Sequence, residues 1–241
     1  MNLIQKFKSI FIPKAEEDDE TEEASVSQST SFDPNYKDTV WTENSKPEIG
    51  SFNAVVVADG HGHITPDLLG DINVIPDVFF LLGDNDYDDI EAIKAFLDEY
   101  RYNVPVFGVE GNHDDRGLLK ECGIDDLNGR VIEWNGFRIG GISGSIRYKE
   151  AGNRFMISNG ESEAIADALP LCDILLTHSN PCFQYPDFLT PHSGLTGIGN
   201  YIREKQPKIV LHGHLHDQFV KSYQSTIVRC CWSVECIKIS I

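Results

Sequence analysis

Short apolar runs rich in β-branched residues alternate along this chain with longer segments of helical periodicity. Runs of four to six such residues between turn signals predict strands, and apolar positions three and four apart predict helices. The predicted strands are 54–58, 78–82, 104–109, 174–176 and 209–211, and the predicted helices are 88–100, 115–121, 161–168 and 197–205. This alternation is typical of an α/β fold.

Two further segments of the chain are predicted to form antiparallel strands. Within 131–143, Asn135-Gly136 separates two strand-like runs, which is the strongest short-range hairpin signal. At the end of the chain, the runs 218–223, 226–231 and 233–239 predict a second antiparallel section. Mixed βα units with hairpins indicate two packed sheets flanked by helices.

Each of the five predicted strands is followed by polar residues of a kind that binds metals. In an open α/β sheet, ligands gather at the carboxyl ends of strands, so these residues can converge although they are far apart in sequence. The motifs are Asp59-Gly60-His61, Gly83-Asp84, Gly111-Asn112-His113-Asp114, Thr177-His178 and Gly213-His214-Leu215-His216. Together they predict a site for two metal ions.

The donor types indicate which metals and which chemistry. Carboxylate, amide and imidazole groups without thiolates favour Mn, or alternatively Fe, Zn, Ni or Co, over calcium or a structural zinc. Two such divalent transition metal ions can bind phosphate oxygens, share an activated hydroxide and stabilise an in-line displacement. A carboxylate has to bridge them, and Asp84 is the natural candidate.

The motif series DxH, GD, GNHD, H and GHxH resembles the calcineurin-like metallophosphoesterase superfamily, from about Phe52 to His216. The resemblance implies a four-layer α-β-β-α sandwich of two mixed β-sheets. It also implies a first metal on Asp59, His61 and His216, a second on Asn112, His178 and His214, and Asp84 between them. His113 then faces the substrate as leaving-group acid or charge stabiliser, with Asp114 orienting its imidazole.

The resemblance further implies a dinuclear phosphoesterase in which metal-held hydroxide attacks phosphorus. The arginine after GD and the glutamate after GNH that mark protein serine/threonine phosphatases are absent. The segment 177–181, followed by His192-Ser193-Gly194, is similar to small phosphodiesterases, so a phosphodiester is favoured over a phosphomonoester and His192 can touch substrate. The alternatives are a non-catalytic binding platform whose acidic tail recruits partners, and a repair-type nuclease, which the acidic body and short chain disfavour.

Several residues have competing interpretations. His63 could replace His61, and His212 could be a third ligand instead of a strand-end histidine. Asp84, Asp86, Asp88 and Asp89 could form a calcium loop, although the sixth and twelfth positions do not fit and Asp88 and Asp89 suit a helix start. Cys230, Cys231 and Cys236 could bind zinc, but buried thiols are the expected state.

Aromatic and basic residues offer further contacts with a substrate. Tyr185, Phe188 and Tyr201 could stack on a nucleobase or cover the core. Arg116, Arg147 and Arg154 could grip phosphate oxygens, but the sequence does not distinguish them.

The net charge of the chain limits the classes of substrate that can be expected. The net charge is −18, and residues 51–241 hold 27 acidic and 15 basic side chains, so the folded part is itself acidic. We therefore expect a small phosphoester substrate and no binding of duplex nucleic acid.

Residues 1–47 are expected to form a largely disordered acidic tail with unknown protein partners, and 48–241 a single domain. The amphipathic piece 1–13 is too short for a membrane span and lacks the features of a signal peptide, so a cytoplasmic location is expected.

Overall fold

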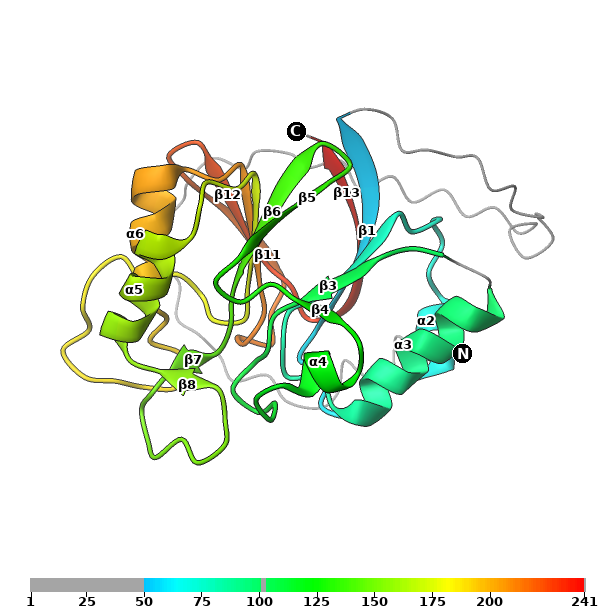
Figure 1. The fold of residues 1–241 in the computed structure, drawn as a ribbon, viewed down its shortest axis with the longest axis horizontal. Helices are drawn as coiled ribbons and strands as arrows, with labels where there is room; N and C mark the ends of the chain where they lie inside the picture. Colours follow the sequence, from blue (N-terminus) through cyan, green and yellow to red (C-terminus); the bar gives the residue numbers. More distant parts are fainter. Residues whose placement is uncertain (1–49, 101–102, 241) are drawn as a thin grey trace. The chain divides into compact units, whose positions relative to one another are not determined.

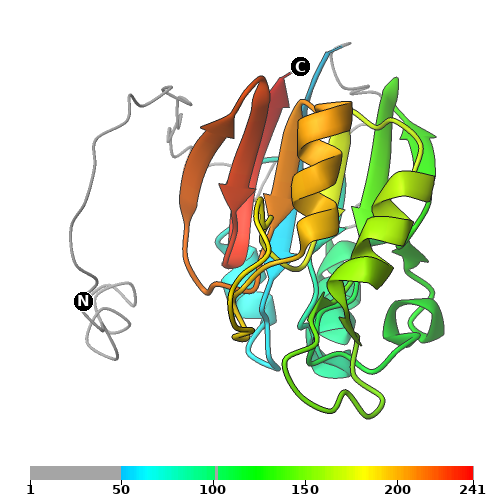
Figure 2. The same cartoon turned by 90° about the vertical axis from the view of Figure 1, so that its left-hand side faces the viewer.

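The computed structural model describes residues 50–100 and 103–240. Two mixed β-sheets lie at the centre, and helices lie along their outer sides (Figure 1, Figure 2). The first sheet has the order β13-β1-β2-β3-β4, with bounds Ser233–Ser240, Ser51–Ala58, Val78–Leu81, Val106–Gly108 and Asp125–Asp126. The pairs β1-β2, β2-β3 and β3-β4 are parallel, so the carboxyl ends of these four strands lie at the same end of the sheet.

The second sheet has the order β11-β12-β10-β9-β6-β5. Its bounds are Phe219–Tyr223, Thr226–Cys230, Ile209–His212, Ile174–Thr177, Phe137–Ile142 and Val131–Trp134. Strands β12, β10, β9 and β6 are parallel, and an antiparallel strand closes each edge. A separate two-stranded piece pairs β7 (Ser145–Ile146) with β8 (Met156–Ile157).

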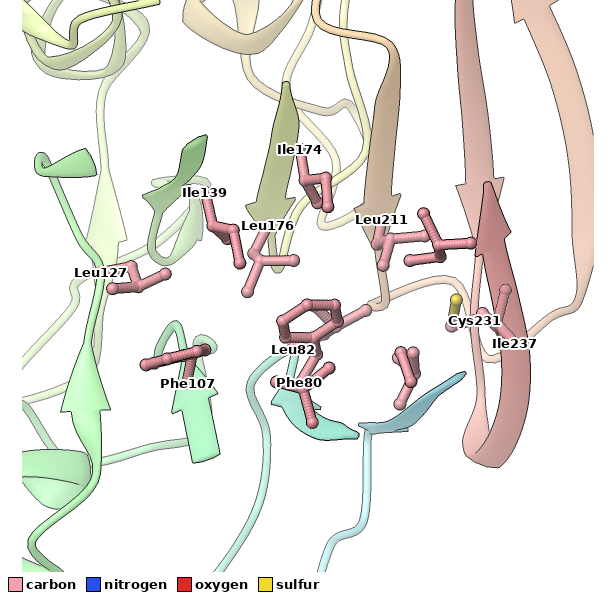
Figure 3. Packing of buried hydrophobic residues seen from close by; sticks show 14 of the residues in the cluster. Phe80, Leu82, Phe107, Leu127, Ile139, Ile174, Leu176, Leu211, Cys231 and Ile237 are labelled. Atoms are coloured by element: carbon pink, nitrogen blue, oxygen red, sulfur yellow. The ribbon is translucent and has the colours of Figure 1, made fainter. Parts of the chain in front are cut away.

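Alternation of side chains along β1 explains the layers. Phe52, Ala54, Val56 and Ala58 point into the core between the sheets, where side chains of both sheets such as Phe80, Leu176 and Leu211 meet (Figure 3). The intervening Val55 and Val57 pack in a second core with helices α2 (Pro66–Gly70), α3 (Tyr87–Glu99) and α4 (Leu118–Glu121).

A third core lies on the outer face of the second sheet, where Leu175 and Val210 pack with α5 (Asn159–Ala168) and α6 (Thr196–Lys205). The four layers are therefore helix, sheet, sheet and helix, which confirms the predicted α/β class and four-layer sandwich.

Helices α3 and α5 begin at capping boxes, whereas α4 and α6 begin without a side-chain cap. In α3, Asp86 and Asp89 form a capping box, and Ile90, Ile93 and Phe96 lie buried on one face. In α5, Ser158 accepts from the Glu161 N–H and Glu161 in turn accepts from the Ser158 N–H. All four predicted helices are present, shifted by one to three residues at their starts.

The predicted hairpin is also present, because Asn135 and Gly136 both adopt the positive φ that a two-residue type I′ turn needs. The carboxyl-terminal section differs from the prediction. Strands β11 and β12 do form a hairpin, but β13 leaves the second sheet and pairs along all of β1, from Ser51↔Ser240 to Ala58↔Ser233. The chain therefore passes between the sheets at Cys231-Trp232. The short elements α2, β4, β7 and β8 were not predicted.

The predicted acidic tail, residues 1–47, and its boundary with the domain lie outside the described residues, and both stay predictions. In the described part of the chain, no helix combines the length and apolar character needed to cross a membrane.

Candidate metal centre

The carboxyl ends of five strands bring the predicted metal ligands together. From the first sheet, Asp59 and His61 follow β1, Asp84 follows β2 and Asn112 follows β3. From the second sheet, His178 follows β9, while His214 and His216 follow β10. The site therefore lies between the two sheets.

Asp59, His61 and His216 form one group that could hold a metal ion, with ligand atoms within 4.8 Å of one another. The Nε2 atoms of His61 and His216 are 3.4 Å apart, and Asp59 Oδ1 lies 3.7 Å from His216 Nε2. Asp59 is buried, His61 is half-buried and His216 is exposed, so this group faces the solvent.

Asp84, His178 and His214 form a second group, which is fully buried. His178 Nε2 lies 3.1 Å from His214 Nδ1, 3.0 Å from Asn112 Oδ1 and 3.4 Å from Asp84 Oδ2. The same Asp84 oxygen lies 3.8 Å from His61 Nε2 of the first group. Asp84 thus stands between the two groups, as expected of a bridging carboxylate.

Backbone carbonyls fix the two buried imidazoles. His178 Nδ1 lies 2.8 Å from the Leu82 carbonyl oxygen, and His214 Nε2 lies 2.8 Å from that of Pro191. A carbonyl only accepts, so each of these nitrogens carries the proton, and the opposite nitrogen of each ring presents its lone pair to the group. The imidazoles are thereby oriented as metal ligands.

The donor set fits two divalent ions. Ligands about 2.1 Å from one ion lie about 3.0–3.4 Å apart, which is the range of the spacings within the buried group. Oxygen and nitrogen donors with no thiolate suit a divalent transition metal. The residues present would hold one ion on Asp59, His61 and His216 and another on Asn112, His178 and His214, with Asp84 shared.

The ionisable groups of the site are also suited to binding cations. Burial raises the pKa of Asp59 despite nearby His178 and His216. Burial acts in the same direction on Asp84, but His178 and the His113 N–H outweigh it and lower the pKa of that carboxyl. Burial lowers the pKa of His214 to about 3, so its imidazole is neutral and able to bind a metal.

The backbone of the site is strained. Five of the seven predicted ligands have positive φ: Asp59, His61, Asp84, His214 and His216. Such conformations persist where the surrounding structure imposes them, and they cluster at functional sites. The strand-end turns pack closely, since a Cβ on Gly111 would lie 2.1 Å from Asp84 Oδ1 and one on Gly83 would lie 2.5 Å from the Gly111 nitrogen. Glycine in these motifs permits that close approach.

Asp114 has different partners from the predicted one. Its buried carboxylate accepts hydrogen bonds from the backbone N–H groups of Gly111 (2.6 Å), Asp84 (2.9 Å) and Asn85 (2.9 Å). Within residues 50–100 and 103–240, no hydrogen bond joins it to the His113 ring. Burial, with Asp84 nearby, raises the pKa of Asp114 to about 7. Asp114 therefore connects the turns after β2 and β3 and positions Asp84.

His113 lies beside the ligands without joining either group. Its exposed ring is 5.2 Å from that of His61, centroid to centroid, and its backbone N–H donates to Asp84 Oδ1 over 2.7 Å. Partial desolvation lowers its pKa, although Asp84 acts in the opposite direction. The role of His113 toward a substrate stays a prediction.

The structure distinguishes between several of the competing interpretations. His63 is exposed and outside both groups, whereas His61 belongs to the first. His212 is buried with Nδ1 2.9 Å from the Gly213 carbonyl oxygen, as predicted for a strand-end histidine. Tyr201 belongs to the core and its hydroxyl donates to the Pro170 carbonyl, so it covers the core and does not face a substrate. His192 lies against His214, with ring centroids 5.0 Å apart.

The acidic run after β2 caps a helix and does not form a calcium loop. Asp89 is buried and accepts from the backbone N–H groups of Gly62, Ile64 and Asp86, which fixes the turn that carries His61. Among the described residues, neither candidate metal group includes a cysteine. Cys230 and Cys231 are buried free thiols as expected, whereas the free thiol Cys236 is exposed. The sequence indicated a helix start at Asp89 but not its bonds to the turn after β1.

The three arginines have different surroundings. Arg147 pairs with Glu161 over 2.9 Å, and Arg116 lies over the Phe155 ring at 4.1 Å. Arg154 is exposed, and its backbone bridges to Asp115, next to the His113-Asp114 turn.

One contact of a candidate ligand was not predicted from the sequence, namely the stacking of Trp232 on His216.

Similarity to one solved structure supports the fold. Protein TT1561 of Thermus thermophilus is 15% identical over 78% of this chain and 98% of its own, with a TM-score of 0.56. The phosphopantetheinyl hydrolase of Mycobacterium tuberculosis is 15% identical (77% and 91% covered, TM-score 0.48), and zinc-complexed Vps29 of Entamoeba histolytica is 14% identical (78% and 98%, TM-score 0.41). No curated protein sequence matches this chain.

At the level of sequence, residues 52–231 match the calcineurin-like phosphoesterase superfamily domain. This segment contains all seven predicted ligands together with His113 and Asp114. The chain belongs to the calcineurin-like phosphoesterase superfamily.

Proposed function

We propose that this protein is a metal-dependent phosphoesterase that hydrolyses a small phosphodiester in preference to a phosphomonoester. The observation that carries the proposal is the convergence of two candidate metal groups on Asp84, with His113 exposed beside them. A platform that only binds partners has no need for two complete ligand sets or for buried imidazoles held in the metal-binding tautomer.

Divalent ions at such a centre would neutralise phosphate charge and activate a water molecule, and Mn is favoured among them. The chain itself supplies position and a proton. Asp114 and Asp89 fix the turns that carry Asp84 and His61. As the new bond from water oxygen to phosphorus forms, the bond to the leaving oxygen breaks. The water gives up one proton to the solvent, and the leaving oxygen takes a proton from the imidazolium form of His113, which the solvent then reprotonates.

The preference for a diester rests on charge. A phosphodiester carries one negative charge and a phosphomonoester close to two at neutral pH. Bound divalent ions would offset the charge of Asp59 and Asp84 at the centre, but the domain around it is acidic as a whole. The surrounding negative charge opposes a dianion more strongly than a monoanion.

The test compares hydrolysis of bis-p-nitrophenyl phosphate and p-nitrophenyl phosphate by metal-stripped protein supplied with Mn²⁺, with Asp84→Asn as control. We expect Mn²⁺ to restore cleavage, chiefly of the diester, in the wild-type protein alone. Cleavage of the monoester alone would replace the diester preference by a phosphatase activity. Failure to cleave either ester with metal bound would favour the binding platform.

A further inference from the structure

Trp232 lies beside the first metal group, at the point where the chain passes from β12 to β13. Its indole is stacked on the imidazole of His216, with ring centroids 6.2 Å apart and planes within 6° of parallel. Trp232 is 45% exposed, and the His216 side chain is 50% exposed. A broad aromatic surface therefore continues outward from the metal centre into the solvent.

The backbone beneath this indole is fixed on both sides. The Trp232 N–H donates to Glu235 Oε1 over 3.0 Å, and its carbonyl accepts from Gln218 Nε2 over 3.1 Å. Glu235 is in turn held by Arg229, whose Nη2 and Nε lie 2.6 and 3.2 Å from Glu235 Oε2 in a largely buried pair. The backbone of Trp232 is thus ordered before a ligand binds. This lowers the entropy cost of binding a ligand to the indole.

Other aromatic residues of the described part do not combine exposure, a fixed backbone and contact with a candidate metal ligand. Trp134 packs in the core against Phe52 and Phe107. Tyr185 and Phe188 are more exposed than Trp232, but they lie in the loop after β9, with Tyr185 bonded to Glu163. Trp232 is the aromatic side chain that joins exposure, a fixed backbone and contact with a candidate ligand.

We propose that Trp232 determines substrate specificity by stacking on a planar aromatic group of the substrate, a nucleobase or an aryl ring, while the phosphate lies at the metal centre. This proposal rests on the proposed function. An indole has a large flat π-surface, and stacking on it tolerates any base because every base presents a similar face. The substrate class is therefore aromatic phosphoesters, with the aromatic part on the Trp232 side of the site.

The test measures binding, so that it does not depend on turnover. The probes are the O-methyl diesters of adenosine 5′-phosphorothioate and of ribose 5-phosphorothioate, which share the sugar and a single negative charge and resist hydrolysis. Calorimetry on the full chain with Mn²⁺ compares wild type, Trp232→Ala, Trp232→Phe and Tyr185→Ala. We expect the adenosine compound to bind wild type about tenfold more tightly, equivalent to ~1.4 kcal/mol.

In Trp232→Ala the two probes should bind within about twofold of each other, with the ribose compound bound as by wild type, while Trp232→Phe and Tyr185→Ala keep most of the preference. An unchanged preference in Trp232→Ala, equal binding of both probes by wild type, or loss in Tyr185→Ala instead would overturn the proposal. A lower Mn²⁺ affinity of Trp232→Ala that accounts for weaker binding of both probes would also overturn the proposal. In that case Trp232 would only support His216.

The two proposals fail separately. Loss of the Trp232-dependent preference alongside metal-restored cleavage of phosphoesters would remove only the specificity assignment. A retained preference without hydrolysis of either chromogenic ester would remove the proposed reaction and keep the aromatic site.

Discussion

Asp84 and His113 are neighbours in space with different surroundings. Asp84 is buried and faces imidazoles of both candidate metal groups, whereas His113 is exposed and contacts the centre through its backbone N–H and the edge of the His61 ring. A carboxylate shared by two cations and an imidazole that donates a proton should fail in different ways when they are removed.

For Asp84→Asn we expect Mn²⁺ affinity and kcat/KM to fall together, each by at least about 100-fold, because the bridging charge is lost. For His113→Ala we expect Mn²⁺ affinity to stay within about threefold of wild type while kcat falls about 10²–10⁴-fold. Equilibrium dialysis and steady-state kinetics measure the two quantities. Equal losses of affinity and kcat in both variants would contradict the assigned roles.

The neighbouring acids Asp88 and Asp89 give a matched pair at the start of α3. Asp89 is buried and accepts from three backbone N–H groups, whereas Asp88 is exposed. Asp89→Asn should lower the free energy of unfolding by about 1–3 kcal/mol and weaken Mn²⁺ binding, since the turn carrying His61 loses charged acceptors. Asp88→Asn should change the free energy of unfolding by less than about 0.5 kcal/mol. Urea unfolding and metal titration would show whether the two variants differ.

At the scale of elements, Asp173 connects three strands of the second sheet. Its carboxylate accepts from the backbone N–H, Nε and Nη2 of Arg138 at the start of β6, and its carbonyl accepts from Lys208 and Ile209 at the start of β10. The Arg138 side chain holds the pKa of Asp173 below its usual value. The ion pair therefore stabilises the folded state above the unfolded pKa of about 3.9, and this contribution is lost as pH falls through the lower folded value.

We expect Asp173→Asn to lower the free energy of unfolding by about 1 kcal/mol at pH 7, a value limited by solvent screening of the half-exposed Arg138. As pH falls below about 4 and through the lower folded pKa of Asp173, the difference from wild type should shrink. Asp125→Asn, which breaks a more exposed pair with Arg130, is the control and should cost less. A difference for Asp173→Asn that persisted unchanged at low pH would show that the charge is not responsible.

The elements that could be predicted are those with a local signal. Strand ends such as Ala58-Asp59 and Leu82-Gly83-Asp84 mark both a buried strand and a ligand, so the fold and the ligand set followed from one pattern. The path of β13 could not be predicted, because nothing between β12 and β13 distinguishes a hairpin from a passage to the other sheet. The contact of Trp232 with His216 depends on that path and was missed for the same reason, whereas the contacts of Asp114 depend on how closely the turns after β2 and β3 approach each other.

At the scale of the whole domain, the metal centre draws on both sheets. Asp59, His61, Asp84 and Asn112 come from the first sheet, whereas His178, His214 and His216 come from the second. Ions bound there would attach the two sheets to each other at one edge of their shared core. Metal occupancy should therefore affect the stability of the domain as a unit.

Stripped protein supplied with Mn²⁺ at about 100 times its Kd should gain about 2.7 kcal/mol for each ion bound, which corresponds to a rise in Tm of roughly 5–10 °C per ion for a domain of this size. Calorimetry with and without chelator measures the change. The rise should be much smaller in Asp84→Asn and unaffected in Asp125→Asn. An equal rise in all three proteins would place the stabilising ion elsewhere.

The pairing of β1 with β13 bears on how the protein is made. During synthesis, β1 leaves the ribosome long before its partner, and Ala58 cannot pair with Ser233 until almost the whole described chain has emerged. Throughout that interval the valine-rich segment 55–57 has one unpaired edge, which is the kind of strand that associates with other chains. This edge therefore stays open until β13 has been made and has paired with β1, and in the folded domain β13 is the strand that protects the first sheet from association with other chains.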